Sequence, residues 1–341
     1  MEFAFSEDQR MMQEAVGEML ANECSHEALA TAWETETGQV EGLWSQMAEL
    51  GILGLTTPES DGGLGLGPVD LVLLLEECGR YAVPEPVSEL VAVAGPLLAE
   101  VGGEVAKAWL PRMAAGDARV AVGLDVNPVV ANAAAADLFL LQHGDEVHAV
   151  PASGVTLRAQ ESVDGGRRVD AVDWSPADTT RIASGEAGRV ALAHAADRGA
   201  AAAAAELLGL GRQLIELTVE YAKGRVQFGQ PIGAFQAVKH HLANAYTKLE
   251  FARAPVYHAA YALQESGESD ATALAVSTAK ALAGDAAHQC FRTALQCHGA
   301  IAYTYEYHAH MWMKRVLVLQ RQYGDARYHR RRASGLLELG A

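Results

Sequence analysis

One short stretch of the chain gathers a cation, amides and two aromatic rings around a sharp turn. It runs from Arg225 to Gln236, with the sequence RVQFGQPIGAFQ, and joins two long helical patterns. An arginine guanidinium offers a planar fork of donors that suits a phosphate or pyrophosphate. Gly229 and Pro231 stop the preceding helix and set the turn. A plain helix connector with a solvated arginine would look the same in isolation, so the rest of the chain must separate the two interpretations.

The first 117 residues have the apolar spacing of helices. The segment Ser6-Glu7-Asp8-Gln9 has the S-x-x-Q form of a capping box, which predicts a helix start. Leu43 to Leu50 predicts a second helix that Gly51 ends, and Val69 to Tyr81 predicts a strongly apolar one. The glycines between Thr57 and Pro68 follow no strand of a βαβ unit. They therefore predict a loop between helices and no dinucleotide-binding fingerprint.

The middle and the end of the chain differ in pattern. Between residues 118 and 190, short apolar runs bounded by Gly, Asp and Pro predict the strands of a small β domain. These runs are Val120–Leu124, Leu138–Leu141, Val147–Val150 and Arg168–Val172. From about Leu192 the helical spacing returns in four long segments with short connections, which predicts an antiparallel four-helix bundle. The predicted fold is mainly α with a small β domain, divided into residues 1–117, 118–190 and 191–341.

Composition and charge narrow the possible functions. The chain has 26 Lys and Arg against 43 Asp and Glu, and this net charge of −17 opposes binding to nucleic acid. None of its four cysteines forms a C-x-x-C pair, which fits a reducing compartment, and a cytoplasmic location is expected. We expect no membrane span, and the start from Met1 to Phe5 is unlike a signal peptide. The H-x-H spacing of His308 and His310 places them on different helix faces, so no metal site is predicted.

Four motifs follow one another along the helical parts. They are FSEDQ at Phe5–Gln9, LGILGL with PE and GGLG between Leu50 and Gly65, RVQFGQPI with FQ between Arg225 and Gln236, and QCHGAIAY with Glu306 after Gln296. These motifs, in the order helices, small β domain and four-helix bundle, resemble those of the acyl-CoA dehydrogenase family. The resemblance implies the fold of that family and the FAD-dependent α,β-dehydrogenation of an acyl-CoA.

The resemblance also implies a role for each matching residue. Arg225 matches the arginine that binds the FAD pyrophosphate of a neighbouring subunit, and Phe228 and the region of Gln227 match residues that lie against the same cofactor. Phe235 and Gln236 match a pair that contacts the flavin, and Gln296 and Gly299 match the turn that holds the adenosine end from the adjacent chain. The residue types suit these roles, since glycine lets backbone approach closely. The predicted cofactor-binding set is Arg225, Gln227, Phe228, Phe235, Gln236, Gln296 and Gly299.

The family's reaction needs a carboxylate base, and both positions known for it depart from the pattern here. Near the C-terminus Tyr323 stands where the resemblance places a glutamate, and a phenol with a pKa of about 10 is a poor base at neutral pH. The other position, in the helix that leads to Arg225, holds Gly199 and Ala200. Asp197 or Glu206 would serve only as a displaced base. No catalytic residue is predicted in this chain.

The middle segment departs further. Ala121 to Asp125 is the nearest match to the family's flavin-cradling strand, and Ala136 to Leu141 follows so soon that the intervening strands look deleted. The chain therefore resembles the smaller, degenerate subunit of actinobacterial α2β2 acyl-CoA dehydrogenases that act on CoA thioesters of steroid side chains. This resemblance implies an acyl-CoA substrate, a homologous partner subunit that supplies the glutamate, and electron-transfer flavoprotein or a similar acceptor. Two alternatives stay open: a self-sufficient homotetramer with a displaced base, and a non-catalytic scaffold subunit.

Overall fold

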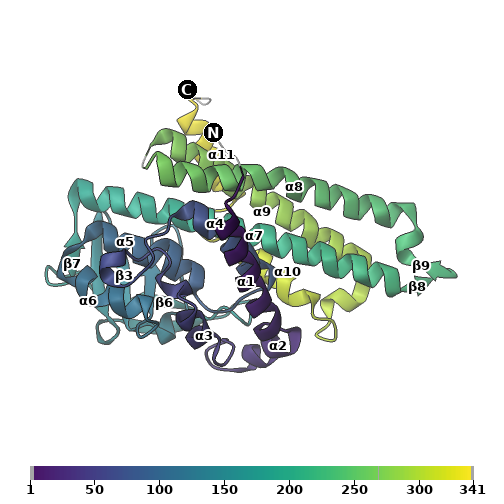
Figure 1. Ribbon diagram of the computed structural model, residues 1–341, viewed down its shortest axis with the longest axis horizontal. Helices are drawn as coiled ribbons and strands as arrows, with labels where there is room; N and C mark the ends of the chain where they lie inside the picture. Colours follow the sequence, from purple (N-terminus) through teal and green to yellow (C-terminus); the bar gives the residue numbers. More distant parts are fainter. Residues whose placement is uncertain (1–3, 268, 339–341) are drawn as a thin grey trace.

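A computed structural model of the protein describes residues 4–267 and 269–338. Met1 to Phe3, which belong to the predicted start of the chain, lie outside the described residues. Helices lead, strands follow between residues 120 and 183, and long helices take up the rest (Figure 1). This confirms the predicted fold class, mainly α with a small β part. Among the residues described, no helix is long and apolar enough to cross a membrane.

The helices before the strands begin and end where local sequence requires it. The Ser6 hydroxyl accepts the backbone N–H of Gln9, and the Gln9 side chain accepts that of Ser6, so the predicted capping box is confirmed. Gly51, with a φ of 73°, lies directly after the C-cap of the second predicted helix. The glycine-rich loop is also confirmed, because only a 3₁₀ turn precedes the apolar helix. The bounds are α1 Glu7–Glu23, α2 His26–Glu34, α3 Leu43–Glu49, α4 Pro68–Arg80, the π-helical η3 Glu89–Ala94, α5 Gly95–Val101 and α6 Gly103–Ala114.

We expect Ser6→Ala to destabilise the protein by about 1 kcal/mol, since it removes the cap of the first helix. The same turn is tied to α4, because the Gln9 amide donates to Asp70 at 2.8 Å. Thermal unfolding of the purified protein should show a midpoint lower by about 2 °C. Ser60→Ala is the control, since its hydroxyl donates only to the adjacent Asp61 in an exposed loop. Equal midpoints for the two variants would contradict the capping argument.

The strands between residues 120 and 183 form two sheets. The first has the order β1-β3-β4-β7, in which β1 and β3 are parallel and the other pairs antiparallel, and the second has the order β2-β6-β5. All four predicted runs are strands, whereas β2, β5 and β7 were not predicted because they are short or largely exposed. The bounds are β1 Val120–Gly123, β2 Val130–Ala131, β3 Leu138–His143, β4 Glu146–Pro151, β5 Thr156–Gln160, β6 Val169–Asp173 and β7 Arg181–Ala183.

The first sheet is buried on both faces. Along β3, Leu138 and Leu140 belong to the main core under the helices, while Phe139 and Leu141 belong to a second core beneath the other sheet. Successive strand residues point to opposite faces, so this run must be apolar throughout. That is why it reads as a continuous hydrophobic stretch in the sequence.

The C-terminal helices form the predicted bundle. The 40-residue α7 (Gly185–Gly224) begins earlier than the helix predicted from Leu192, because its first turns lack an apolar stripe. It lies against α8 (Gln236–Glu265) and α9 (Asp270–His298), with α10 (Ala309–Leu319) on one side and α11 (Ala326–Leu336) packed on α9 (Figure 1). Helix α8 runs through Pro255 without a break. The domain boundaries at residues 117 and 190 stay predictions.

Small residues let α7 approach α4 at backbone distance. A Cβ at Gly209 would lie 1.8 Å from the carbonyl oxygen of Glu76, and one at Gly79 would lie 2.0 Å from that of Glu206. Neither glycine can therefore carry a side chain in this packing. The alanine run Ala200–Ala205, which precedes Gly209 on α7, is buried, as a tightly packed helix requires. This close packing fixes the position of α7 along its axis relative to the N-terminal helices.

A buried arginine joins three parts of the chain. The guanidinium of Arg315, on α10, pairs with Asp164 in the loop between β5 and β6 and donates to the carbonyl of Val83 after α4 at 2.6 Å. Both charged side chains are almost fully buried. Such a pair costs desolvation energy and is kept only where its hydrogen bonds are satisfied. It fixes the position of the strands relative to both groups of helices.

Candidate functional site

The Arg225 segment forms a short β-hairpin with a two-residue turn at the end of α7. β8 (Val226–Gln227) pairs with β9 (Gln230–Pro231), and the turn residues Phe228 and Gly229 have φ values of 52° and 79°. Two consecutive residues with positive φ are what a tight hairpin needs, but the first of them is a bulky aromatic for which this conformation is costly. The backbone of Arg225 is fixed on both sides of the turn, since its N–H donates to Tyr221 and its carbonyl accepts from Ile232, both at 2.8 Å.

The side chains of this hairpin point into solvent. Phe228 is 93% exposed, and its ring meets that of the half-buried Phe235 edge to face at 6.2 Å. Arg225 and Gln236 are exposed, and within residues 4–267 and 269–338 no acid lies at ion-pair distance from the Arg225 guanidinium. An exposed aromatic ring in a strained turn beside an unpaired cation indicates a surface that meets another molecule.

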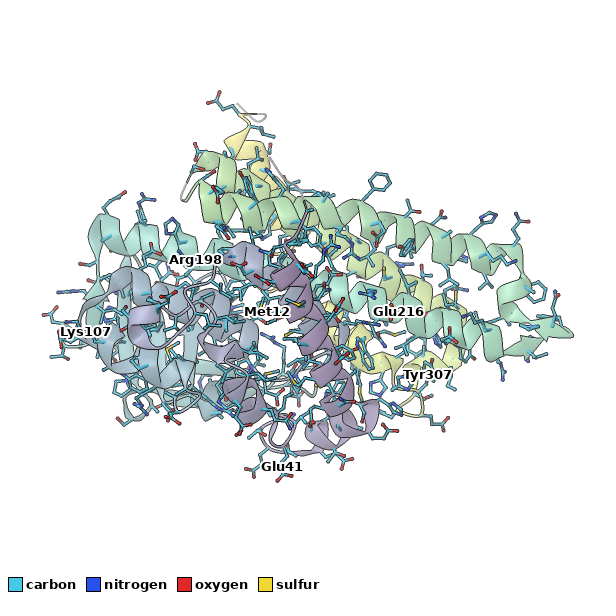
Figure 2. The ribbon with its side chains drawn as sticks, in the orientation of Figure 1. Met12, Glu41, Lys107, Arg198, Glu216 and Tyr307 are labelled. Carbon is cyan, nitrogen blue, oxygen red and sulfur yellow. The ribbon has the colours of Figure 1, made fainter. Side chains whose placement is uncertain are left out.

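The second predicted segment lies at the same end of the bundle. Gln296 is exposed in the last turn of α9, and Gly299 ends that helix with a φ of 68°. The rings of Tyr221 and His298 are 4.3 Å apart, and both also contact Tyr307, which Figure 2 labels on this side. The structure therefore brings together the two segments that contain all seven predicted cofactor-binding residues.

These segments lie far from the strands of the same chain. In Figure 1 the β8–β9 hairpin occupies the right-hand end of the molecule, whereas β3, β6 and β7 occupy the left. A group held by the chain's own sheets would be out of reach of Arg225.

The two predicted base positions meet in one place. Tyr323, with a φ of 55°, is buried so closely on α7 that a Cβ at Gly199 would lie 2.4 Å from its Cε1 and Cζ atoms. The Tyr323 N–H donates to Asn127 at 2.7 Å, and its carbonyl accepts from His329 at 2.9 Å, so the residue is held firmly. Burial raises the pKa of the Tyr323 hydroxyl far above its usual value. The ring stays neutral and cannot accept a proton at neutral pH.

The two candidate displaced bases are in different environments. Asp197 is engaged by Arg332, whose two terminal nitrogens both bind the carboxylate, one of them at 2.9 Å. Glu206 is buried, and burial together with the negative charge of Glu89 raises its pKa to about 7. It lines a small cavity with Gly199 and Tyr323, two turns further along α7. A carboxyl group with such a pKa can exchange a proton near neutral pH.

A network that the sequence did not predict closes the same cavity. The Glu89 carboxylate binds both the Arg167 guanidinium and the Gln322 amide, the latter at 3.0 Å. Burial alone would raise the pKa of Glu89, but the charge of Arg167 and the hydrogen bonds to the carboxylate together hold that pKa below its usual range. No local motif could have identified this network, because the three residues come from η3, the β5–β6 loop and the segment after α10. It fixes the backbone next to Tyr323.

Two larger pockets flank this region. One of about 480 Å³ lies beside β1, where the resemblance predicted a flavin-cradling strand. Half of its lining residues are Val, Ala or Pro, and Arg119, Arg167 and Arg321 also line it. Within the described part of the chain, neither amide atom of the buried Asn132 has a hydrogen-bond partner. The other, of about 580 Å³, has apolar walls from α4, η3, α5, α7 and α8, and its lining includes Glu100 and Arg198, which pair at 2.9 Å. Either pocket has room for a small organic molecule.

Two family models and several known proteins match the sequence of this chain. Residues 6–117 match the family model described as acyl-CoA dehydrogenase, N-terminal domain, and residues 186–334 match that of the C-terminal domain. The chain is 32% identical over 311 residues to acyl-CoA dehydrogenase IpdE2 of Mycobacterium tuberculosis, covering 91% of each protein. The IpdE2 of Mycolicibacterium smegmatis is 31% identical over 315 residues, which cover 91% of this chain and 93% of that protein.

Solved structures give the same result for the fold. The Tcur3481-Tcur3483 steroid ACAD, solved in a variant form, is 26% identical, with a TM-score of 0.86 and 98% of each chain covered. A chain of the ChsE4-ChsE5 complex from Mycobacterium tuberculosis has a TM-score of 0.90 over 100% of both chains at 24% identity, which shows a common fold.

Proposed function

The chain belongs to the acyl-CoA dehydrogenase family, and on this basis we propose that it is one subunit of a heteromeric, FAD-dependent enzyme whose homologous partner supplies the catalytic base. The family removes the α hydrogen of an acyl-CoA as a proton and the β hydrogen as a hydride. FAD supplies the hydride acceptor when it is bound. The proton must go to a carboxylate of this chain or of its partner.

The observation that carries the proposal is the packing of Tyr323 on Gly199. Both positions where the resemblance places a base are occupied here by groups without a carboxylate, and the aromatic ring fills the space between them. A substrate α carbon could not reach that space while the ring is there. The Glu89, Arg167 and Gln322 network holds the loop in place, and so do the hydrogen bonds between the Tyr323 backbone and the side chains of Asn127 and His329. We therefore infer that this chain does not abstract the proton of the substrate.

This chain would contribute the residues at the exposed end of its helical bundle to the binding of FAD. The residues there fit FAD, because Arg225 offers a guanidinium with no acid beside it among the described residues, and Phe228 offers an uncovered ring. We assign Arg225 to the pyrophosphate, Gln227 and Phe228 to the adjoining part of the cofactor, and Phe235 with Gln236 to the flavin side. Gln296 and Gly299 would face the adenosine. The FAD itself would lie on the partner.

The relatives support a steroid-linked and two-component enzyme. The solved steroid ACAD carries two component names, Tcur3481 and Tcur3483, and an enzyme of two different subunits would explain a chain without a base. We propose a CoA thioester of a steroid side chain as substrate, an α2β2 assembly, and electron-transfer flavoprotein or a similar acceptor. The cytoplasm is the proposed location.

The direct test is co-expression of the chain with the homologous dehydrogenase subunit encoded beside it. We expect a stable complex that holds FAD and oxidises a steroid side-chain CoA thioester, with no turnover from this chain alone. Replacing the partner's catalytic glutamate by glutamine should abolish turnover without loss of FAD. A lone chain that is yellow and active would refute the proposal.

One observation favours a second candidate, in which Glu206 is a displaced base in a self-sufficient enzyme. Its pKa of about 7 and its place in the cavity beside Tyr323 would suit a proton acceptor. In that case Glu206→Gln would abolish turnover while FAD stayed bound. We expect turnover of the complex to be unchanged instead.

The Glu206→Gln substitution should also change the stability of the protein in a pH-dependent way. Because burial raises the pKa of Glu206 from 4.5 to about 7, the folded protein holds its proton more tightly than the unfolded chain does. The stability that depends on this proton is present below pH 4.5 and lost as the pH rises through 7. Glu206→Gln should therefore be more stable than the wild type by roughly 2–3 kcal/mol at pH 8, and the difference should vanish near pH 4.5.

Denaturant unfolding of both proteins at several pH values would measure this difference. Glu220→Gln is the matched control, because Glu220 lies on the same helix but is exposed and paired with Lys223. It should show no such pH dependence. If Glu206→Gln were more stable than the wild type by the same amount at every pH, the pKa of Glu206 would be the same in the folded and the unfolded protein.

A further inference from the structure

Three metal-binding side chains share one face of the β3–β4 hairpin. His143 and Glu146 are directly opposite each other across the strands, and His148 is two residues beyond Glu146 on β4. Residues i and i+2 of a strand lie on the same side of a sheet, so the register puts all three together. The sequence analysis predicted no metal site, because this grouping depends on strand register rather than on a spacing motif.

The three candidate ligand atoms converge. Glu146 Oε2 lies 3.1 Å from His148 Nε2 and 3.6 Å from His143 Nδ1, and all three atoms lie within 4.8 Å of one another. Ligands bound at 2.0–2.1 Å in a tetrahedron are about 3.3 Å apart. Only a small rotation of His143, which is 61% exposed at the end of the hairpin, would complete that geometry.

Hydrogen bonding orients the ring of His148. The Thr180 hydroxyl donates to the carbonyl of Ala177 at 2.9 Å, so it must accept from His148 Nδ1, which is also 2.9 Å away. Nδ1 therefore carries a proton, and Nε2 is the nitrogen that faces the Glu146 carboxylate. A neighbour that orients the imidazole through its other nitrogen is usual in metal sites.

The surroundings hold the other groups in place. Arg181 Nη1 binds Glu146 Oε1 at 3.0 Å, which leaves Oε2 facing the histidines. The Trp174 ring packs on the buried His148 at 5.0 Å. The turn of the hairpin is fixed against α7, because a Cβ at Gly188 would lie 2.0 Å from the carbonyl oxygen of Asp145. The open side, next to His143, leaves room for a water ligand.

We propose that His143, Glu146 and His148 bind a first-row divalent cation, with Zn²⁺ the best match. Two imidazoles and one carboxylate form a donor set that Zn²⁺ takes with water in the fourth position. The ion would fasten the β3–β4 hairpin to β7 through the Thr180 and Arg181 contacts of its ligands. The site lies with the sheets, at the opposite end of the molecule from the Arg225 hairpin (Figure 1).

Isothermal titration of the chelator-treated full-length protein with Zn²⁺ tests the site. We expect one Zn²⁺ to bind per chain, and His143→Ala to weaken this binding at least about tenfold. The exposed His143 can be removed without opening the core, and Glu146→Gln removes the charged ligand while keeping its shape. Both variants should also lose the rise in unfolding temperature that Zn²⁺ gives the wild type.

His241→Ala is the matched control, since His241 is an exposed histidine on α8 far from the hairpin in sequence. It should bind Zn²⁺ as the wild type does. Visible absorption of bound Co²⁺ would report a low-coordinate nitrogen and oxygen site. Absence of saturable Zn²⁺ binding would overturn the proposal, and so would His143→Ala and Glu146→Gln variants that bind as tightly as the wild type.

Discussion

Arg225→Ala should strip FAD from the assembled enzyme. A guanidinium can form two charge-assisted hydrogen bonds to a pyrophosphate, and losing one partner of such a pair at an interface costs several kcal/mol. We therefore expect FAD binding to weaken by roughly 100- to 1,000-fold. The fold should not change, because the Arg225 side chain is exposed and its backbone makes the hydrogen bonds of the turn.

The measurement is the flavin content per chain of the co-purified complex after buffer exchange, followed by titration with FAD. Lys223→Ala is the matched control, because Lys223 is exposed in the last turn of the same helix and pairs only with Glu220 among the described residues. Arg225→Lys should bind FAD with intermediate affinity, since it keeps the charge but loses the planar fork. Unaltered flavin content in Arg225→Ala would favour the scaffold alternative.

Features set by short segments could be predicted from the sequence. The cap at Ser6, the stop at Gly51 and the turn at Gly229 each depend on a few consecutive residues, and the structure has them where expected. The Arg225 and Gln296 motifs could also be located from the sequence, because each lies at the end of a long helix. Their meeting at one end of the bundle follows from the antiparallel arrangement that the helix lengths predict.

Features that join distant segments could not be predicted. Arg315 and Asp164 pair across 151 positions, and Glu89 and Arg167 across 78, so no periodicity or motif reveals either pair. Each is a buried charge that needs one particular partner, which only the packed chain identifies. The same is true of Tyr323 and Gly199. The sequence marks both as departures from the family, but only the structure shows that the ring of one requires the missing side chain of the other.

Gly199→Ala should destabilise the protein by about 3 kcal/mol, because the new methyl group would overpack the contact with Tyr323. Adding a methyl group inside a packed core costs about 1–3 kcal/mol when neighbours can shift. Here the new Cβ would lie 2.4–2.7 Å from three ring atoms of Tyr323, whose backbone is held by Asn127 and His329. Gly284→Ala is the control, because a Cβ at this buried helical glycine meets nothing within 4 Å. It should stabilise by up to about 1 kcal/mol.

A double-mutant cycle separates the ring contact from any general effect on α7. Tyr323→Gly removes the ring and also suits the positive φ at that position, and Gly199→Ala in this background should then cost nothing. The interaction energy between the two sites should be about 3 kcal/mol, measured by denaturant unfolding of the four proteins. Additive effects would mean that the ring does not press on α7. The space between the two base positions would then be open, and the case for a partner that supplies the base would lose the observation on which it rests.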